Sequence, residues 1–166
     1  NTSQSCDGDI RVTVQYPGGS GVVPEELKLY DSGWQELESV SPSSSTYTFS
    51  NLDPGTYHVE AYDDDMFIGS AENINATAGE TAYRTITTHY KGDIEVTVHC
   101  SDGTSALQGA AVKLYNHEQR YLTQGTTDTS GEVAFADRWP TTKAGEYYYV
   151  KVYYDSSQVG TSSHFQ

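Results

Sequence analysis

Residues 8–14 read GDIRVTV and residues 92–98 read GDIEVTV, so the two stretches differ only at their fourth position. They lie 84 residues apart. In both, apolar and polar side chains alternate, which is typical of a β-strand with one face toward a core and the other toward water. We therefore predict that each stretch is the first strand of a β-structured module.

The similarity continues beyond these strands. Matching segments are LKLY (27–30) with VKLY (112–115), Phe49 and Pro54 with Phe135 and Pro140, and VEAY (59–62) with VKVY (150–153). The order is kept while the offset grows from 84 to 91 residues, as short loop insertions would cause. Matching segments that recur in the same order at nearly the same spacing indicate an internal repeat. We predict one module in residues 1–90 and a second in residues 91–166.

The pattern between the matches favours strands alone. Turn signals separate the apolar runs at residues 17–19 (PGG), 31–33 (DSG), 53–55 (DPG), 102–103 (DG) and 130–131 (SG). No window has a convincing helical period, and 166 residues suit two modules of roughly 80 residues each. We predict an all-β chain of two tandem immunoglobulin-like Greek-key sandwiches.

Two segments carry a family resemblance. The first module contains FSNLDPGTYHV (49–59) and the second contains TDTSGEVAF (127–135). These segments resemble the carboxypeptidase regulatory-like and collagen-adhesin B-type modules, which share a prealbumin-like seven-stranded sandwich. The resemblance implies a stalk, spacer or adhesive module outside the cell. Some family members form an internal Lys–Asn isopeptide bond, but no Asn at the end of a final strand matches here.

The second module is shorter than the first. Residues 82–88 are predicted to form the closing strand of the first module. Aligning residues 159–161 with residues 68–70 places Gln166 opposite Asn75, and nothing in the sequence then matches residues 76–88. We predict that the second sandwich lacks its closing strand. The alternatives are a shorter variant of the module and a truncated chain.

An open sheet edge predicts a way of assembling. Its unpaired N–H and C=O groups invite a strand from another chain, and head-to-tail contacts of this kind build filaments unless they close into a ring. The predicted donor tail precedes the first Gly-Asp-Ile as residues 85–90 precede the second; it comprises Asn1, Thr2, Ser3, Gln4 and Ser5. These residues are polar and few, whereas a donor strand normally supplies apolar side chains.

Cys6 and Cys100 are the two cysteines, and we expect them to form a disulfide in an exported chain. If the modules stack end to end, the two residues lie roughly 45 Å apart. A disulfide needs Cα atoms within about 7 Å. A bond between subunits therefore fits better, while an intrachain bond and two reduced thiols remain alternatives.

Charge and composition bound the partners and the location. The formal net charge of −14 argues against nucleic acid and anionic membranes, and no stretch approaches the ~20 apolar residues of a membrane span. The chain starts at Asn1 rather than Met, which we interpret as a mature exported chain; the alternative is a trimmed one. Sequons at Asn1 and Asn75 predict glycosylation and an extracellular setting.

No catalytic motif is present in the sequence. HExxH, CxxC, G-x-S-x-G and phosphate-binding loops are all missing, and the five histidines are scattered. His58 and His99 fall on polar-face positions, so we expect both to be exposed. We predict a protein that is not an enzyme and needs no cofactor.

Two clusters could still bind a ligand. Asp63, Asp64 and Asp65 could bind Ca²⁺ in a hairpin loop, with a solvated turn as the simpler interpretation. Trp34, Trp139 and the tyrosines of residues 147–154 could stack on sugars, or pack against subunits or a core.

Taken together, these features predict a structural subunit of an extracellular filament, pilus or cell-surface layer. Its partners would be copies of itself, joined head to tail by β-strand addition, and glycans could be further partners. The alternative is a cell-surface adhesion module or a carbohydrate-binding accessory module.

Overall fold

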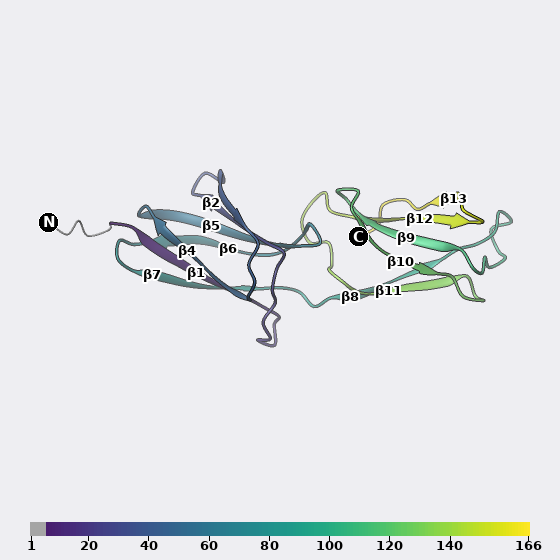
Figure 1. Ribbon diagram of the computed structural model, residues 1–166, viewed down its shortest axis with the longest axis horizontal. Helices are drawn as coiled ribbons and strands as arrows, with labels where there is room; N and C mark the ends of the chain where they lie inside the picture. The colour runs from purple at the N-terminus through teal and green to yellow at the C-terminus, as the bar shows by residue number, and fades with distance from the viewer. Residues whose placement is uncertain (1–5) are drawn as a thin grey trace. The chain divides into compact units, whose positions relative to one another are not determined.

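The computed structural model describes residues 6–166, and all of the regular structure in this range is β, without a helix. The chain divides into two compact units (Figure 1). The first contains the described residues up to Asp63 together with Phe67–Tyr90, and the second contains Asp64–Met66 together with Lys91–Gln166. The prediction of an all-β chain is confirmed.

The first unit is built from seven strands in two sheets. They are β1 (Gly8–Gln15), β2 (Glu26–Asp31), β3 (Glu36–Val40), β4 (Thr46–Leu52), β5 (Gly55–Asp63), β6 (Met66–Ala76) and β7 (Thr81–Thr87). One sheet has the order β4-β1-β7 and the other has the order β3-β2-β5-β6. Strand β1 pairs antiparallel with β4 and parallel with β7, so it is the central strand of its sheet.

Strand β1 forms because its apolar and polar residues alternate, and one of its faces lies on the core while the other faces solvent. Ile10, Val12 and Val14 are fully buried, while Arg11 on the opposite face is exposed. Phe49 of β4 and Ile86 of β7 are also buried, so all three strands of this sheet contribute to the core. Each such side chain stabilises the fold by about 1.5–3 kcal/mol through burial.

The second unit repeats this arrangement with six strands. They are β8 (Gly92–Thr97), β9 (Ala111–Asn116), β10 (Tyr121–Thr126), β11 (Glu132–Arg138), β12 (Tyr148–Tyr154) and β13 (Ser157–Thr161). One sheet has the order β10-β9-β12-β13, which mirrors β3-β2-β5-β6 of the first unit. The other contains only β11-β8, so within residues 6–166 no strand occupies the place that β7 takes beside β1.

The core of the second unit gathers around Trp139. This side chain is 2% exposed, and its carbonyl oxygen accepts a hydrogen bond of 2.8 Å from the buried Tyr148 hydroxyl. Val150 and Val152 lie on the same face of β12 as Tyr148 and are buried with it. Trp139 therefore cannot stack on a sugar, because its ring belongs to the core.

A membrane-crossing helix is not found among residues 6–166, where no helix of sufficient length and hydrophobicity occurs.

Candidate functional site

The candidate site is the outer edge of β8. In the first unit the odd-numbered residues of β1 face β7: the N–H of Asp9 donates to Glu80 O (2.9 Å), and Gln15 O accepts from the N–H of Thr88 (2.9 Å). The even-numbered Val14 instead bonds toward Ser45 on the β4 side. Strand β8 pairs with β11 through the same parity, because the N–H of Val98, the counterpart of Val14, donates to Gly131 O (2.8 Å).

Alternation then assigns the backbone groups of the open edge. Asp93, Glu95 and Thr97 of β8 direct their N–H and C=O groups away from β11. Among the described strands none pairs with this side of β8. These groups can therefore accept an added strand in the way that β1 accepts β7.

The side chains under this edge are less covered than their counterparts. Ile10, Val12 and Val14 are 0% exposed, whereas Ile94 and Val96 of β8, and Val98 directly after it, are only partly buried. The sequences are nearly identical, so the difference comes from what covers them. In the first unit β7 provides that cover, and its Ile86 reaches into the core.

A groove marks the place of the missing strand. It has a volume of about 410 Å³ and is lined mainly by apolar side chains of the second unit, including Val98, Leu107, Val152 and Val159. Val159 of β13 is 56% exposed, while its counterpart Ile68 in the first unit is 3% exposed. The groove therefore corresponds to the space that β7 covers in the first unit.

Two glycines show that Ile86 of β7 fills this space in the first unit and that the corresponding space in the second unit is open. A Cβ atom added to Gly69 would lie 2.6 Å from Cγ2 of Ile86, so Gly69 permits the close approach of β7. At the equivalent Gly160, the only atom within 4 Å of an added Cβ is Cβ of Val152, at 3.9 Å, within the described chain. Gly160 thus keeps an open position for a side chain such as Ile86.

The two cysteines are not bonded to each other in this structure. Cys6 is exposed, and Cys100 is half-buried at the lining of the groove, with its Sγ atom 3.9 Å from Ala106 O. A single chain does not test a bond between subunits, so the intersubunit disulfide stays a prediction. The predicted donor tail, Asn1, Thr2, Ser3, Gln4 and Ser5, lies outside the described residues, as does the sequon at Asn1.

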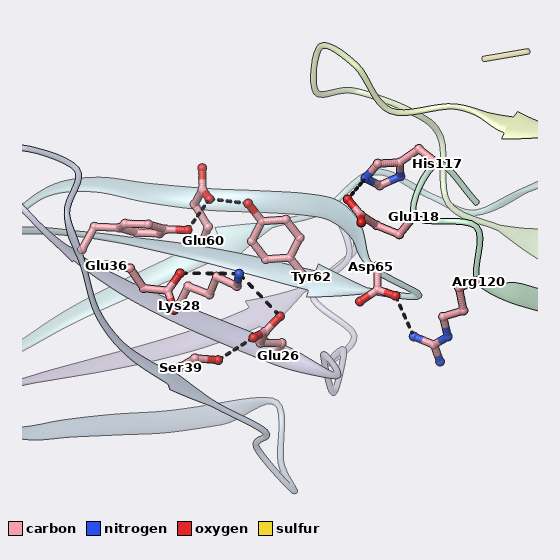
Figure 2. Close-up of polar contacts among 11 residues, drawn as sticks. Glu26, Lys28, Glu36, Ser39, Glu60, Tyr62, Asp65, His117, Glu118 and Arg120 are labelled. Carbon is pink, nitrogen blue, oxygen red and sulfur yellow. Dashed lines mark hydrogen bonds and ion pairs between the residues drawn. The ribbon is translucent and has the colours of Figure 1, made fainter. Parts of the chain in front are cut away.

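The three consecutive aspartates form a tight turn, and two of them already pair with arginine side chains. Asp64 and Asp65 have φ angles of 53° and 57°, as the two central residues of a type I′ hairpin require. Within the second unit, Asp65 Oδ2 lies 3.3 Å from Arg120 Nη1 (Figure 2), and Asp64 Oδ2 lies 3.7 Å from Arg138 Nη1. No group of three metal-ligating side chains is found in residues 6–166. Ca²⁺ binding at Asp63, Asp64 and Asp65 stays a prediction.

The remaining predicted residues have ordinary surroundings. Asn75 is exposed on β6, and its Oδ1 accepts a hydrogen bond of 3.0 Å from Thr56 Oγ1, so glycosylation there stays a prediction. His99 is exposed as expected, but the expectation for His58 is wrong. His58 is 5% exposed because Trp34 stacks on its ring at 4.2 Å, with an angle of 2° between the planes.

A polar cluster on the first unit involves Tyr30 and Tyr62. Both hydroxyls donate to the same oxygen of Glu60, and the bond from Tyr30 measures 3.1 Å. Figure 2 shows Tyr62 beside Glu60. Burial, and then the neighbouring Glu60 carboxylate, raise the pKa of Tyr30 to about 12. Burial and the hydrogen bond to Glu60 also raise the pKa of Tyr62. We interpret the cluster as structural, because the two hydroxyls and the carboxylate satisfy one another's hydrogen bonds.

Sequence reasoning missed one contact that bears on the site. The rings of Tyr16 and Tyr90 stack with centroids 5.7 Å apart and 12° between their planes. Subtracting the repeat offset of 84 from Tyr90 gives Cys6, and adding it to Tyr16 gives Cys100. The repeat offset could therefore have shown that Cys6 and Cys100 occupy the positions of Tyr90 and Tyr16.

Known proteins resemble the chain in structure only. No protein family model and no curated protein matches it. A streptococcal ancillary pilin superposes with a TM-score of 0.56 at 11% identity, covering 97% of this chain and 60% of the pilin. The minor pilin GBS52 of Streptococcus agalactiae gives 0.56 at 13% identity, covering 94% and 84%. The Bacillus anthracis TIE protein is 20% identical with a TM-score of 0.43, and this chain spans 28% of its length. The superpositions on the two pilins show a shared β fold and nothing further.

Alanine substitutions at the equivalent Gly69 and Gly160 test whether a side chain packs against each glycine. Gly69→Ala should destabilise the first unit by about 1–3 kcal/mol, because the added methyl group overpacks against Ile86. Gly160→Ala should be neutral or stabilise the second unit by up to about 1 kcal/mol. Urea denaturation of the reduced monomer, read by Trp34 fluorescence in a Trp139→Phe background and by Trp139 in a Trp34→Phe background, separates the two units. If both substitutions lowered the free energy of unfolding equally, the groove would not be the space that β7 covers in the first unit.

Alkaline pH should weaken the first unit. The pKa of Tyr30 is raised in the folded state, so its neutral form is favoured and its contribution is complete below the ordinary pKa of 10.0. That contribution is lost as the pH rises from there to about 12. The double variant Tyr30→Phe/Tyr62→Phe should show a flatter fall of the unfolding free energy above pH 10 than the parent, in urea titrations. An unchanged slope would refute the coupling.

Proposed function

We propose that this protein is a non-enzymatic structural subunit of an extracellular filament or pilus, assembled by β-strand addition at the open edge of β8. The observation that carries the proposal is the contrast between two nearly identical strands. In the first unit β1 has neighbours on both sides, and in the second unit β8 has only β11 among the described strands. Copies of the same chain are the proposed partners.

The architecture behind this proposal is two tandem immunoglobulin-like, prealbumin-like Greek-key sandwiches. Residues 1–90 form the first, and residues 91–166 form the second, which lacks its closing strand. The strand orders of the two units support this, since they match apart from β7. The shared fold with an ancillary pilin and a minor pilin is consistent with a surface filament.

The internal strand β7 serves as the template for the donor. It runs parallel to β1 in the register Ile86↔Val14. Moving this register by 84 residues places Thr2 of a second copy opposite Val98, with its side chain at the groove. The donated segment is Asn1, Thr2, Ser3, Gln4 and Ser5. It precedes β1 of its own chain as β7 precedes β8.

A contact of this kind propagates rather than closes. The acceptor edge belongs to the second unit and the donor precedes the first, so each copy offers one of each and the contact is heterologous. A net charge of −14 on every copy opposes association, and salt screens this repulsion. Assembly should therefore strengthen as ionic strength rises.

Blocking one backbone group on the edge tests the proposal. Thr97→Pro removes an N–H that faces away from β11, and proline is tolerated at such edge positions, so the monomer should stay folded. In the register of β7, Thr97 lies opposite Asn1 of the incoming strand, so the proline ring should obstruct pairing of that strand. We expect concentration-dependent oligomers of the parent and a monomer for Thr97→Pro, measured by light scattering after size exclusion in 0.15 M salt with reductant.

Thr97→Val is the matched control, because it keeps the N–H group and a β-branched side chain; it should assemble like the parent. Oligomers of Thr97→Pro that equal those of the parent would refute strand addition at β8. A parent that remains monomeric at every concentration and binds members of a glycan array would instead favour the carbohydrate-binding alternative.

A further inference from the structure

We infer that Cys6 of one copy forms a disulfide with Cys100 of the next, which fixes the donated strand in the open edge of β8. This inference rests on the proposed function and adds a covalent site to it. Its partner is a second copy of this chain, and its position follows from an aromatic contact inside the first unit.

The stacked pair Tyr16 and Tyr90 provides the template. Tyr16 directly follows β1, and Tyr90 follows β7 on its way to β8. Their rings lie 5.7 Å apart at 12°, so the side chains of these two positions point toward each other. With an offset of 84 residues, Cys100 is the counterpart of Tyr16 and Cys6 is the counterpart of Tyr90.

The backbone around Cys100 matches that around Tyr16. The N–H of Tyr16 donates to Ser20 O (2.8 Å), and the N–H of Cys100 donates to Ser105 O (2.8 Å). Two residues earlier, Val14 O and Val98 O each accept a bond of 2.9 Å from a residue farther along the hairpin. Cys100 therefore holds the position of Tyr16 at the end of the groove.

The spacing on the donor side also fits. Tyr90 lies two positions before Gly92, where β8 starts, and Cys6 lies two positions before Gly8, where β1 starts. A donated strand that follows the path of β7 would thus bring Cys6 past the end of β8 and then enter its own first unit. Cys100 of the acceptor copy is half-buried there, and Cys6 of the incoming copy is exposed, so the two side chains can reach each other.

The energetics explain why a covalent bond would be useful. Ordering each residue of the donated segment costs roughly 1–2 kcal/mol of backbone entropy. Each new hydrogen bond returns only about 0.5–1.5 kcal/mol. Thr2 also has a smaller apolar side chain than its counterpart Ile86. Strand addition by this tail alone is therefore weak, and a disulfide would make it persist.

The chemistry needs an oxidant, for which a low-molecular-weight disulfide such as oxidised glutathione is sufficient. The thiolate of one cysteine attacks this disulfide and releases one reduced glutathione thiol. The thiolate of the second cysteine then displaces the other glutathione and forms the S–S bond between the copies. Two cysteine thiols are oxidised, one glutathione disulfide is reduced to two thiols, and an oxidising extracellular medium supports the step.

Isotope mixing distinguishes a bond between copies from one within a chain. Equal amounts of ¹⁴N- and ¹⁵N-labelled chain are mixed, oxidised with oxidised glutathione and digested without reductant. Tryptic peptides 1–11 and 92–113 should then appear as a disulfide-linked pair, with mixed-isotope pairs as abundant as the two pure pairs together. Pairs of pure isotope only would mean an intrachain bond and would overturn the inference.

Single-cysteine variants test the direction of the bond. The parent should give a ladder on a non-reducing gel that collapses with reductant, and Cys6→Ser or Cys100→Ser alone should give no ladder. A mixture of these two variants should give a dimer only. Dimers of Cys100→Ser by itself, linked through two Cys6 residues and as abundant as the parent's, would contradict a head-to-tail bond.

Two further variants separate this inference from strand addition itself. Cys6→Ser should still form oligomers that dissociate on dilution; if it does and the parent gives no mixed pair, the disulfide is refuted while strand addition stands. If neither forms oligomers, both proposals fail. In a Cys6→Ser/Cys100→Ser background, Tyr16→Cys/Tyr90→Cys should form an intrachain disulfide under the same oxidant. Failure to do so would remove the template.

Discussion

The structure depends on one requirement: the N–H and C=O groups along the first strand of each unit need hydrogen-bond partners. Strand β1 meets this requirement on both sides, through β4 and the parallel β7. Strand β8 has nearly the same sequence but meets it on one side only within the described chain. An unpaired edge remains solvated or recruits another backbone, and the apolar groove beside it favours recruitment.

The repeat made most of the fold predictable. Alternation in residues 8–14 identified the buried positions of β1, since Ile10, Val12 and Val14 are the residues that reach the core. Strand β3 was harder to predict, because its residues are almost entirely exposed and carry no alternating apolar signal. His58 was misjudged for a related reason: its cover comes from Trp34, which is distant in sequence and whose position no local pattern reveals.

The site was predictable in outline but not in detail. Counting strands in the repeat located the open edge, since no stretch within residues 91–166 matches residues 76–88. The groove was not foreseen, because Gly69 and Gly160 look alike in sequence and differ only in whether Ile86 covers them. Similarly, two tyrosines and two cysteines share no chemistry, so only their spacing relates the Tyr16–Tyr90 stack to Cys100 and Cys6.

The parallel pairing of β1 and β7 also has a mechanical consequence. The chain enters this pair at Asp9 and leaves it at Thr87, and these residues lie at opposite ends of the seven-residue register. Tension applied between the two ends would therefore load all of the interstrand hydrogen bonds simultaneously in shear, and would not break them one after another. The rate of forced unfolding of the first unit would then reflect rupture of the whole ladder.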